Sequence, residues 1–125
     1  MTDSRFLDSS AWLSYFYAKN NEIRPLVESN TLLLTSSISI FEIKSRLIKD
    51  KIEHIKLQKS MDLIKSRSLI IDIDFEIADN AVELSIKNKL HTADALIYSS
   101  ALKNNDILIT LDNDFRGLNS VIIID

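Results

Sequence analysis

Acidic residues recur in this sequence at places where an apolar run ends or a helical pattern begins. Each of these residues offers only oxygen atoms, the ligands that Mg²⁺ and Mn²⁺ prefer in proteins. Carboxylates packed together raise one another's pKa values unless a cation offsets their charge. The spacing therefore predicts one anionic pocket that holds Mg²⁺ or Mn²⁺, and its candidate residues are Asp8, Glu42, Asp94 and Asp112, with Asp114 as an additional or alternative ligand.

Other chemistries have few residues to draw on. The chain has no cysteine, which excludes disulfides, thiolate metal sites and thiol nucleophiles. Gly117 is the only glycine, so neither a dinucleotide-binding G-x-G-x-x-G motif nor a Walker-type loop is present. The two histidines, His54 and His91, lie in different segments, which leaves little basis for a Ser-His-Asp triad or a His-rich zinc site. Carboxylates remain as the chemical groups.

The elements that must position these acids alternate between apolar strands and periodic helices. We expect strands at Ser4–Leu7, Leu32–Thr35, Leu69–Ile73, Ile107–Thr110 and Val121–Ile124. We expect helices at Ser10–Ala18, from Pro25 to about Ser29, and at Ser39–Lys49, Ile52–Lys65, Phe75–Asn88 and Thr92–Asn104. Strands that are apolar on both faces predict a mainly parallel sheet between two helical layers. The whole chain, residues 1–125, is therefore predicted to be a single three-layer α/β/α domain.

Parallel sheets bind ligands beyond the carboxyl ends of their strands. Asp8 follows the first predicted strand directly, and Asp112 lies just past the strand Ile107–Thr110. Glu42 and Asp94 lie in the opening turns of predicted helices. All four are therefore expected at one edge of the sheet.

Local structure offers a simpler explanation for each acid taken alone. An acid near a helix N-terminus often serves as a cap or complements the helix dipole. Because four acids share the pattern, a site is favoured over four independent caps. The local alternatives are a capping box of Ser39 with Glu42, a cap at Thr92 with Asp94 complementing the dipole, a cap at Asp8, and an ordinary turn at Asp112–Asp114.

The composition describes an ordinary globular chain with an uneven charge distribution. It is 46% hydrophobic with a net charge of −3, and no apolar run approaches the roughly 20 residues that span a bilayer. The opening residues lack a signal-peptide layout, so a cytoplasmic protein is expected. From Lys44 to Arg67 there are eight basic and three acidic residues, or +5. This segment is either a solvated pair of helix faces or a surface that meets phosphates beside the acidic pocket.

The motifs resemble those of the PIN-domain ribonucleases along the whole chain. Phe6–Ser10 is similar to the opening strand that ends in Asp, and the segment from Ser37 to Glu42 is similar to the one that carries the family's Glu. Thr92–Ile97 resembles the helix start with the third acid, and Ile109–Phe115 resembles the closing strand with its Thr-x-Asp turn. The size, with no further domain, resembles the toxins of VapBC-type toxin–antitoxin pairs.

The resemblance implies a Mg²⁺- or Mn²⁺-dependent endoribonuclease with a PIN-like fold, an RNA substrate, an antitoxin partner and a homodimeric state. It implies that Asp8, Glu42, Asp94 and Asp112 are catalytic, with Asp8 and Asp94 as first choices for direct ligands. Ser10 and Thr110 occupy positions where the family uses small polar residues to orient the acids, although many members carry Asn at the position of Ser10. Exposed apolar surface on helices Ser10–Ala18 and Ile52–Lys65 is a candidate for the homodimer or antitoxin contact.

Other functions fit the sequence less well or remain open. A receiver or aspartyl-phosphatase domain needs a D-x-D spacing at the first strand, and Asp8-Ser9-Ser10 lacks it. A PIN-like domain that only binds RNA or protein, and an RNA-processing nuclease outside a toxin–antitoxin pair, remain alternatives. Trp12, Phe16 and Tyr98 lie at helical spacing among apolar neighbours, so we expect core packing rather than base stacking.

Overall fold

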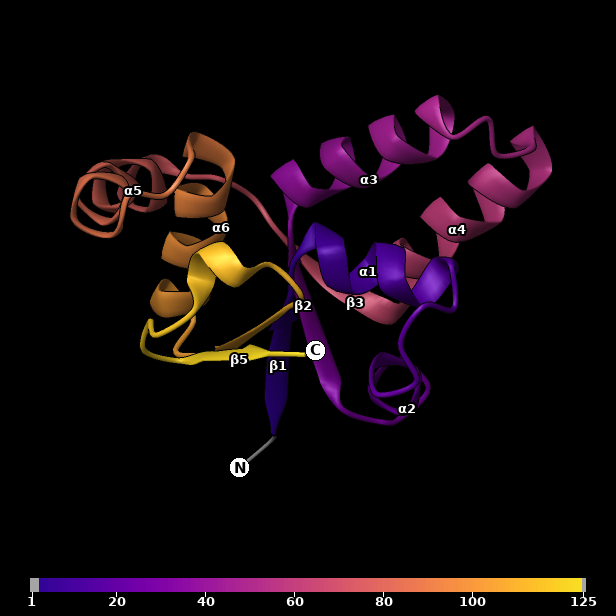
Figure 1. Cartoon of the computed structure of the whole chain (residues 1–125), viewed down its shortest axis with the longest axis horizontal. Coiled ribbons are helices and arrows are strands. Elements are labelled where there is room, and N and C mark those ends of the chain that lie inside the picture. Colours follow the sequence, from indigo (N-terminus) through magenta and orange to yellow (C-terminus); the bar gives the residue numbers. More distant parts are fainter. Residues whose placement is uncertain (1–2, 125) are drawn as a thin grey trace.

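A computed structural model describes residues 3–124 as one layered α/β unit built on a five-stranded sheet. All neighbouring strands pair in parallel, in the order β3-β2-β1-β4-β5. The first strand is central, so the chain winds outward from it in both directions (Figure 1). The strands are β1 (Ser4–Leu7), β2 (Leu32–Ser36), β3 (Ser68–Ile71), β4 (Ile107–Thr110) and β5 (Val121–Ile123).

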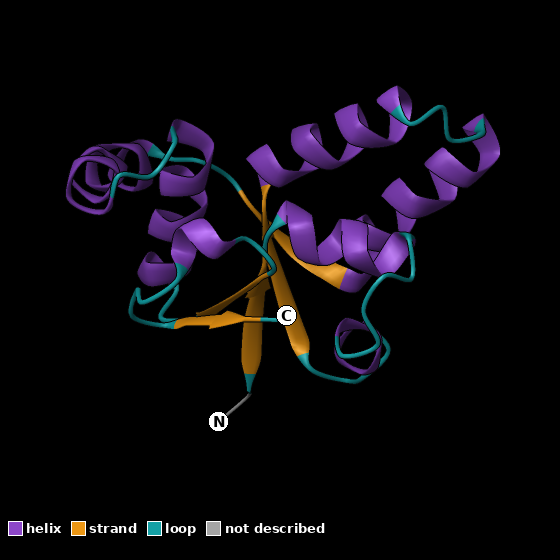
Figure 2. Ribbon diagram, in the orientation of Figure 1, coloured by secondary structure: helices purple, strands orange, loops and turns teal. Residues whose placement is uncertain are grey.

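Helices cover both faces of the sheet, as Figure 2 shows. One layer contains α1 (Ser9–Phe16), α2 (Ile23–Val27), α3 (Ser37–Lys49) and α4 (His54–Arg67). The other contains α5 (Phe75–Asn88) and α6 (Thr92–Lys103), with a short 3₁₀ helix, η1 (Asn113–Phe115), after β4. The predicted three-layer α/β/α fold with a parallel sheet is confirmed. Across residues 3–124, every helix is too short or too polar to cross a bilayer.

The core divides into two clusters because successive residues of a strand face opposite sides of the sheet. In β1, Leu7 packs into the cluster under α1–α4, whereas Phe6 packs into the cluster under α5 and α6. Leu33 and Leu34 of β2 divide in the same way. This arrangement explains why the strands read as continuous apolar runs rather than as alternating ones. Trp12 and Tyr98, predicted as core residues, are both buried, one in each cluster.

The end of α1 and the start of α4 differ from the predicted ones because non-glycine residues, Ala18 and Lys51, adopt left-handed backbone there. Helix α1 ends at Phe16 rather than Ala18, which has φ 52°, and the next amide, of Lys19, donates to the Ser14 carbonyl. Helix α3 ends at Lys49, and Ile52, predicted to open α4, instead donates its amide to the Leu47 carbonyl. Both are Schellman-type closures, which glycine usually provides.

Helix α4 ends at Arg67, whose guanidinium bonds four backbone carbonyls of an earlier segment. It donates to the carbonyl of Val27 at 2.6 Å and to that of Thr31 at 2.7 Å. It also reaches the carbonyls of Leu26 and Ser29, at 3.3 and 3.0 Å. Arg67 therefore satisfies backbone groups at the end of α2 and in the loop before β2. Its Nε and Nη2 groups are bonded within the fold, so the residue has a structural role.

Candidate metal centre

Asp8 is the single residue between β1 and α1. Its Oδ1 accepts a hydrogen bond from the Ala11 amide at 3.0 Å and so caps α1, as its position in the sequence allows. Its amide donates to the Ile109 carbonyl of the neighbouring strand at 3.3 Å. The side chain is only 3% exposed. Asp8 is therefore a buried carboxylate fixed at the carboxyl edge of the sheet.

Two hydroxyls orient this carboxylate. Ser10 Oγ donates to Asp8 Oδ1 at 2.7 Å, and Thr110 Oγ1 donates to Asp8 Oδ2. The same oxygens accept amide hydrogens, Ser10 Oγ from Leu111 at 2.9 Å and Thr110 Oγ1 from Asp112 at 3.0 Å. The network joins the end of β1 to the end of β4, residues about 100 positions apart in the chain. Ser10 and Thr110 lie where the resemblance implied orienting residues.

Three further carboxylates gather beside Asp8. Asp94 comes from the first turn of α6, Asp112 from the residue before η1, and Asp114 from η1 itself. One oxygen of each lies within 4.8 Å of the others, and no other group of three metal-ligating side chains this close occurs among residues 3–124. Asp94 and Asp112 are half-buried and Asp114 is exposed. This spacing is compatible with three ligands of a single cation.

The charge of the cluster appears most clearly at Asp94. Burial, and then the negative charges of the other four acids, raise the pKa of its carboxyl from 3.8 to about 6. The contributing acids are, in decreasing order, Asp112, Glu42, Asp8 and Asp114. Burial likewise raises the pKa of Asp8 to about 6, although the hydroxyls of Ser10 and Thr110 oppose it. All five acids singled out in the sequence therefore converge at one site.

Glu42 reaches the site from α3, but not as a capping-box residue. The predicted capping box is wrong, because α3 begins at Ser37 and its cap is Ser36, whose hydroxyl accepts from the Ile38 amide. Burial raises the pKa of Glu42 and a hydrogen bond with Ser9 opposes this. Its Oε1 is buried without a hydrogen-bond partner. A buried carboxylate oxygen left in this way fits a cation ligand better than a cap.

The predicted cap at Thr92 is also wrong. The N-cap of α6 is His91, which makes no side-chain capping bond, and Thr92 is already helical. Asp94 remains in the first turn, where the helix dipole stabilises its charge. His91 is exposed.

The donor set fits a hard divalent cation. It consists of carboxylate and hydroxyl oxygens, and it includes neither sulfur nor imidazole nitrogen. Such sets suit Mg²⁺ and Mn²⁺. The buried Oε1 of Glu42 and the raised pKa values of Asp8 and Asp94 mark negative charge that a cation would offset.

Solved structures with the same fold include several from toxin–antitoxin systems. A chain of a toxin–antitoxin complex from Klebsiella pneumoniae is 26% identical, with a TM-score of 0.78 over 94% of this chain and 95% of that one. VapBC2 from Rickettsia felis, bound to a fragment of its promoter DNA, is 22% identical, with a TM-score of 0.77 over 97% of each chain. VapC20 from Mycobacterium tuberculosis, a toxin that cleaves the sarcin-ricin loop, is 15% identical, with a TM-score of 0.72 over 91% of this chain and 94% of that one.

A sequence comparison with curated proteins finds no significant match. The family model for the PIN domain, in contrast, matches residues 5–120, almost the whole chain. That span contains both ends of the carboxylate site, from Asp8 to Asp114. The chain belongs to the PIN domain family.

Proposed function

We propose that this protein is a Mg²⁺- or Mn²⁺-dependent endoribonuclease and the toxin of a VapBC-type toxin–antitoxin pair. The observation that carries the proposal is the convergence of five carboxylates at the carboxyl edge of the sheet, with the pKa of Asp94 raised to about 6. Among residues 3–124 these acids form no ion pair with a basic side chain, and so many acids held together in this way weaken a fold unless the site uses them. The family match and the toxin–antitoxin neighbours support the same function.

Each acid has a role in this proposal. Asp94, Asp112 and Asp114 offer three closely spaced oxygens for the ion, and Asp8 and Glu42 complete the anionic wall as ligands, directly or through water. When bound, the ion supplies the positive charge that orients and activates water and stabilises the leaving oxygen of a phosphodiester. The hydroxyls of Ser10 and Thr110 hold Asp8 in one orientation. Fixed orientation matters because loosely held ligands lose metal affinity.

The substrate in this proposal is RNA, held through its phosphates. The basic residues of α3, of α4 and of the turn between them supply the positive surface, and they are mostly exposed. Arg67 is excluded from this role because its guanidinium is bonded to backbone carbonyls. The remaining seven are Lys44, Arg46, Lys49, Lys51, Lys56, Lys59 and Lys65.

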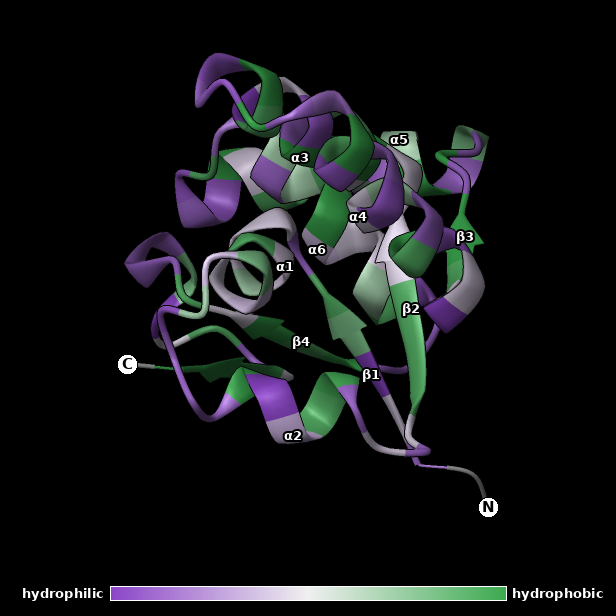
Figure 3. Cartoon of the chain, turned by 90° about the vertical axis from the view of Figure 1, so that its right-hand side faces the viewer, coloured by the Kyte–Doolittle hydropathy of each residue, from purple (hydrophilic) through white to green (hydrophobic). Residues whose placement is uncertain are grey.

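An antitoxin partner is proposed from exposed apolar residues on the α3–α4 layer. Ile48 and Ile55 are 55% and 61% exposed near the turn between the two helices. Figure 3 shows hydrophobic and hydrophilic residues side by side on these helices. Apolar groups rimmed by charge are typical of protein contacts. The solved neighbours include toxin–antitoxin complexes, which supports this partner.

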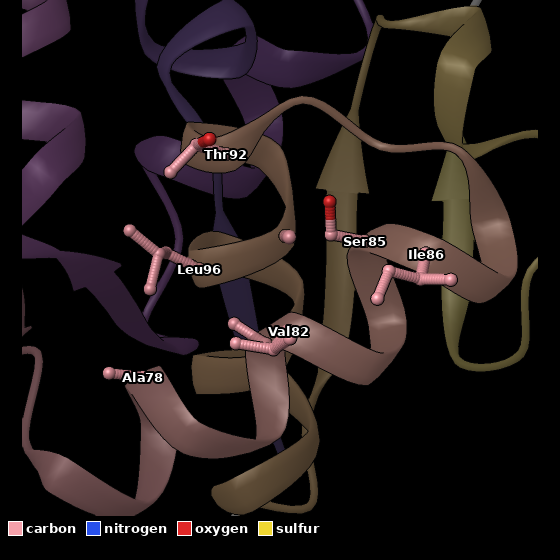
Figure 4. A pocket seen from close by; sticks show the side chains of 8 residues that line it. Ala78, Val82, Ser85, Ile86, Thr92 and Leu96 are labelled. Atoms are coloured by element: carbon pink, nitrogen blue, oxygen red, sulfur yellow. The ribbon is translucent and has the colours of Figure 1, made fainter.

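A homodimer is proposed through α5. Phe75, Val82 and Ile86 are 85%, 58% and 77% exposed and share one side of the helix. A groove of about 210 Å³ lies beside them, between α5 and α6, where Val82 and Leu96 line it (Figure 4). The acids of α5 lie in its first three turns and Lys87 in its last, so an antiparallel copy about a twofold axis pairs opposite charges. Ile86→Asp is expected to yield a monomer in light scattering.

The direct test is cleavage of labelled structured RNA by the purified chain in Mg²⁺ or Mn²⁺. EDTA and Asp94→Asn are each expected to abolish cleavage, whereas Asp79→Asn, an exposed acid of α5, leaves it intact. Cleavage that persists with EDTA and in Asp94→Asn contradicts the carboxylate–metal mechanism. RNA that is bound but never cut favours the alternative of a non-catalytic RNA-binding domain.

Co-expression distinguishes the toxin from an RNA-processing nuclease. Expression of the chain is expected to arrest growth, and the product of an adjacent small gene is expected to restore it. Cleavage of RNA without arrest or a neutralising neighbour favours RNA processing.

A further inference from the structure

A second hollow continues the carboxylate site along the groove between α1 and α3. It encloses about 190 Å³, and its near end is formed by Ser10 and Leu111. Ser10 is the residue whose hydroxyl bonds both Asp8 and the Leu111 amide. Arg46, which lines its far part, lies one helical turn beyond Glu42 on the same side of α3. The hollow is thus continuous with the site on both helices, which lie next to each other in Figure 1.

A residue in the wall of the hollow has an unpartnered hydroxyl. Ser14 lines it from α1 and is only 3% exposed, yet its Oγ makes no hydrogen bond. Helical serines commonly bond the carbonyl four residues earlier, as Ser60 does here with Lys56. A buried donor left unpaired weakens the fold unless something bonds it. Leu13 and Leu111 make the rest of this wall apolar.

The rim of the hollow is cationic and aromatic. Arg46 Nε bonds Asp50 Oδ2 at 3.1 Å, and Tyr17 donates its hydroxyl to the same oxygen at 2.5 Å. Lys19 Nζ lies 5.5 Å from the centre of the Tyr17 ring. The Arg46–Asp50 pair is exposed, and such pairs are weak enough for a phosphate to replace the carboxylate. A basic rim, an aromatic ring and an apolar wall are the features that hold single-stranded nucleic acid.

We propose that this hollow binds the RNA nucleotide next to the scissile phosphate, a subsite that rests on the proposed ribonuclease function. Its base lies against Leu13 and Leu111 with an edge bonded to Ser14 Oγ, and its phosphate meets Arg46 and Lys19. The volume is below the 300 Å³ at which drug-sized pockets begin, which suits one nucleotide unit rather than a larger ligand. The RNA strand would thereby be held in line with the acids at the near end of the hollow.

The test measures binding of a short fluorescein-labelled single-stranded RNA of mixed sequence by anisotropy. The full chain carries Asp94→Asn so that the RNA stays intact. Added Arg46→Ala is expected to weaken binding and reduce its dependence on log salt by about one ion. Arg24→Ala is the matched control, because Arg24 pairs with Glu28 four residues on, as Arg46 does with Asp50, and it does not line the hollow.

Ser14→Ala separates a binding role from a folding role. Removal of an unpaired buried hydroxyl leaves the melting temperature unchanged or higher. Its RNA affinity is nevertheless expected to fall roughly 2- to 10-fold, the ratio that one neutral hydrogen bond gives. The subsite proposal is overturned if Arg46→Ala and Ser14→Ala each bind RNA as tightly as the Asp94→Asn chain does. It is also overturned if the two substitutions change antitoxin binding alone. Failure of the ribonuclease proposal is a separate result, because it is loss of cleavage by the unmutated chain.

Discussion

Asp8 and Asp74 occupy the same local position before two different helices, α1 and α5. Each precedes a helix with extended backbone, and each accepts a hydrogen bond from the amide three residues on, Ala11 at 3.0 Å and Ile77 at 2.9 Å. Their electrostatics are opposite. Burial raises the pKa of Asp8 to about 6, whereas the Lys103 ammonium lowers the pKa of Asp74 below 3.8.

The difference comes from residues distant in the sequence. Asp8 is covered by the end of β4 and faces other acids, while Asp74 is open to solvent beside Lys103, which also contacts Glu76 at 3.0 Å. Capping therefore neither identifies a functional acid nor excludes one. At Asp8 the cap fixes the carboxylate in place, and the surrounding acids determine what it can do.

The largest expected contrast between the two caps is in catalysis. Asp8→Asn keeps an oxygen for the cap but removes a charge from the site, so RNA cleavage in Mg²⁺ is expected to fall about 100-fold or more. Asp74→Asn removes a charge far from the site and is expected to leave cleavage within about twofold. Initial rates on one labelled RNA compare the two variants. Equal losses in both variants would show that capping, rather than the carboxylate site, supports activity.

Stability against pH provides the second contrast. In metal-free protein, Asp8 has a folded pKa above its unfolded value, so the native state binds more protons between pH 3.8 and about 6. The free energy of unfolding then falls as pH rises through this window. Asp8→Asn removes that fall and is expected to gain on the order of 2–3 kcal/mol at pH 7. Asp74 has the opposite sign, because its contribution is present above pH 3.8 and is lost as pH decreases below it.

Urea denaturation in EDTA at pH 4 and pH 7 tests the sign for Asp8, and a further measurement below pH 3.8 tests the sign for Asp74. Asp8→Asn should match the unmutated chain at pH 4 and exceed it at pH 7, whereas Asp74→Asn should be less stable at pH 7. A gain for Asp8→Asn that is the same at both pH values would mean that the burial of its charge is not the cause.

The sequence predicts the parts of this comparison that depend on pattern. Apolar runs such as Leu32–Thr35 and the acids after them are visible in the sequence, and so is the shared sheet edge. The end of α1 and the start of α4 were harder to predict, because Ala18 and Lys51 take the left-handed positions that glycine usually marks. The choice of Ser36 over Ser39 as a cap depends on where β2 stops.

Distant contacts also could not be read from the sequence. The partners of Arg67 lie 36 to 41 residues away, so its charge appeared to belong to the basic surface. The hollow at Ser14 depends on the packing of α1 against α3 and on Leu111 after β4. A local sequence pattern cannot indicate that three elements distant in the chain pack together.

The smallest expected contrast divides the last two acids. Asp112 is itself a cap, because its Oδ1 accepts a hydrogen bond from the Asp114 amide at 2.9 Å. It is half-buried, so its exposure is intermediate between that of Asp8 and that of Asp74. Because Asp114 is exposed and more easily replaced by water, Asp114→Asn is expected to weaken Mn²⁺ binding less than about tenfold, and Asp112→Asn more. Thermal shift against Mn²⁺ concentration measures both affinities. A larger loss for Asp114→Asn would make the exposed acid the fourth ligand and leave Asp112, like Asp74, as a cap.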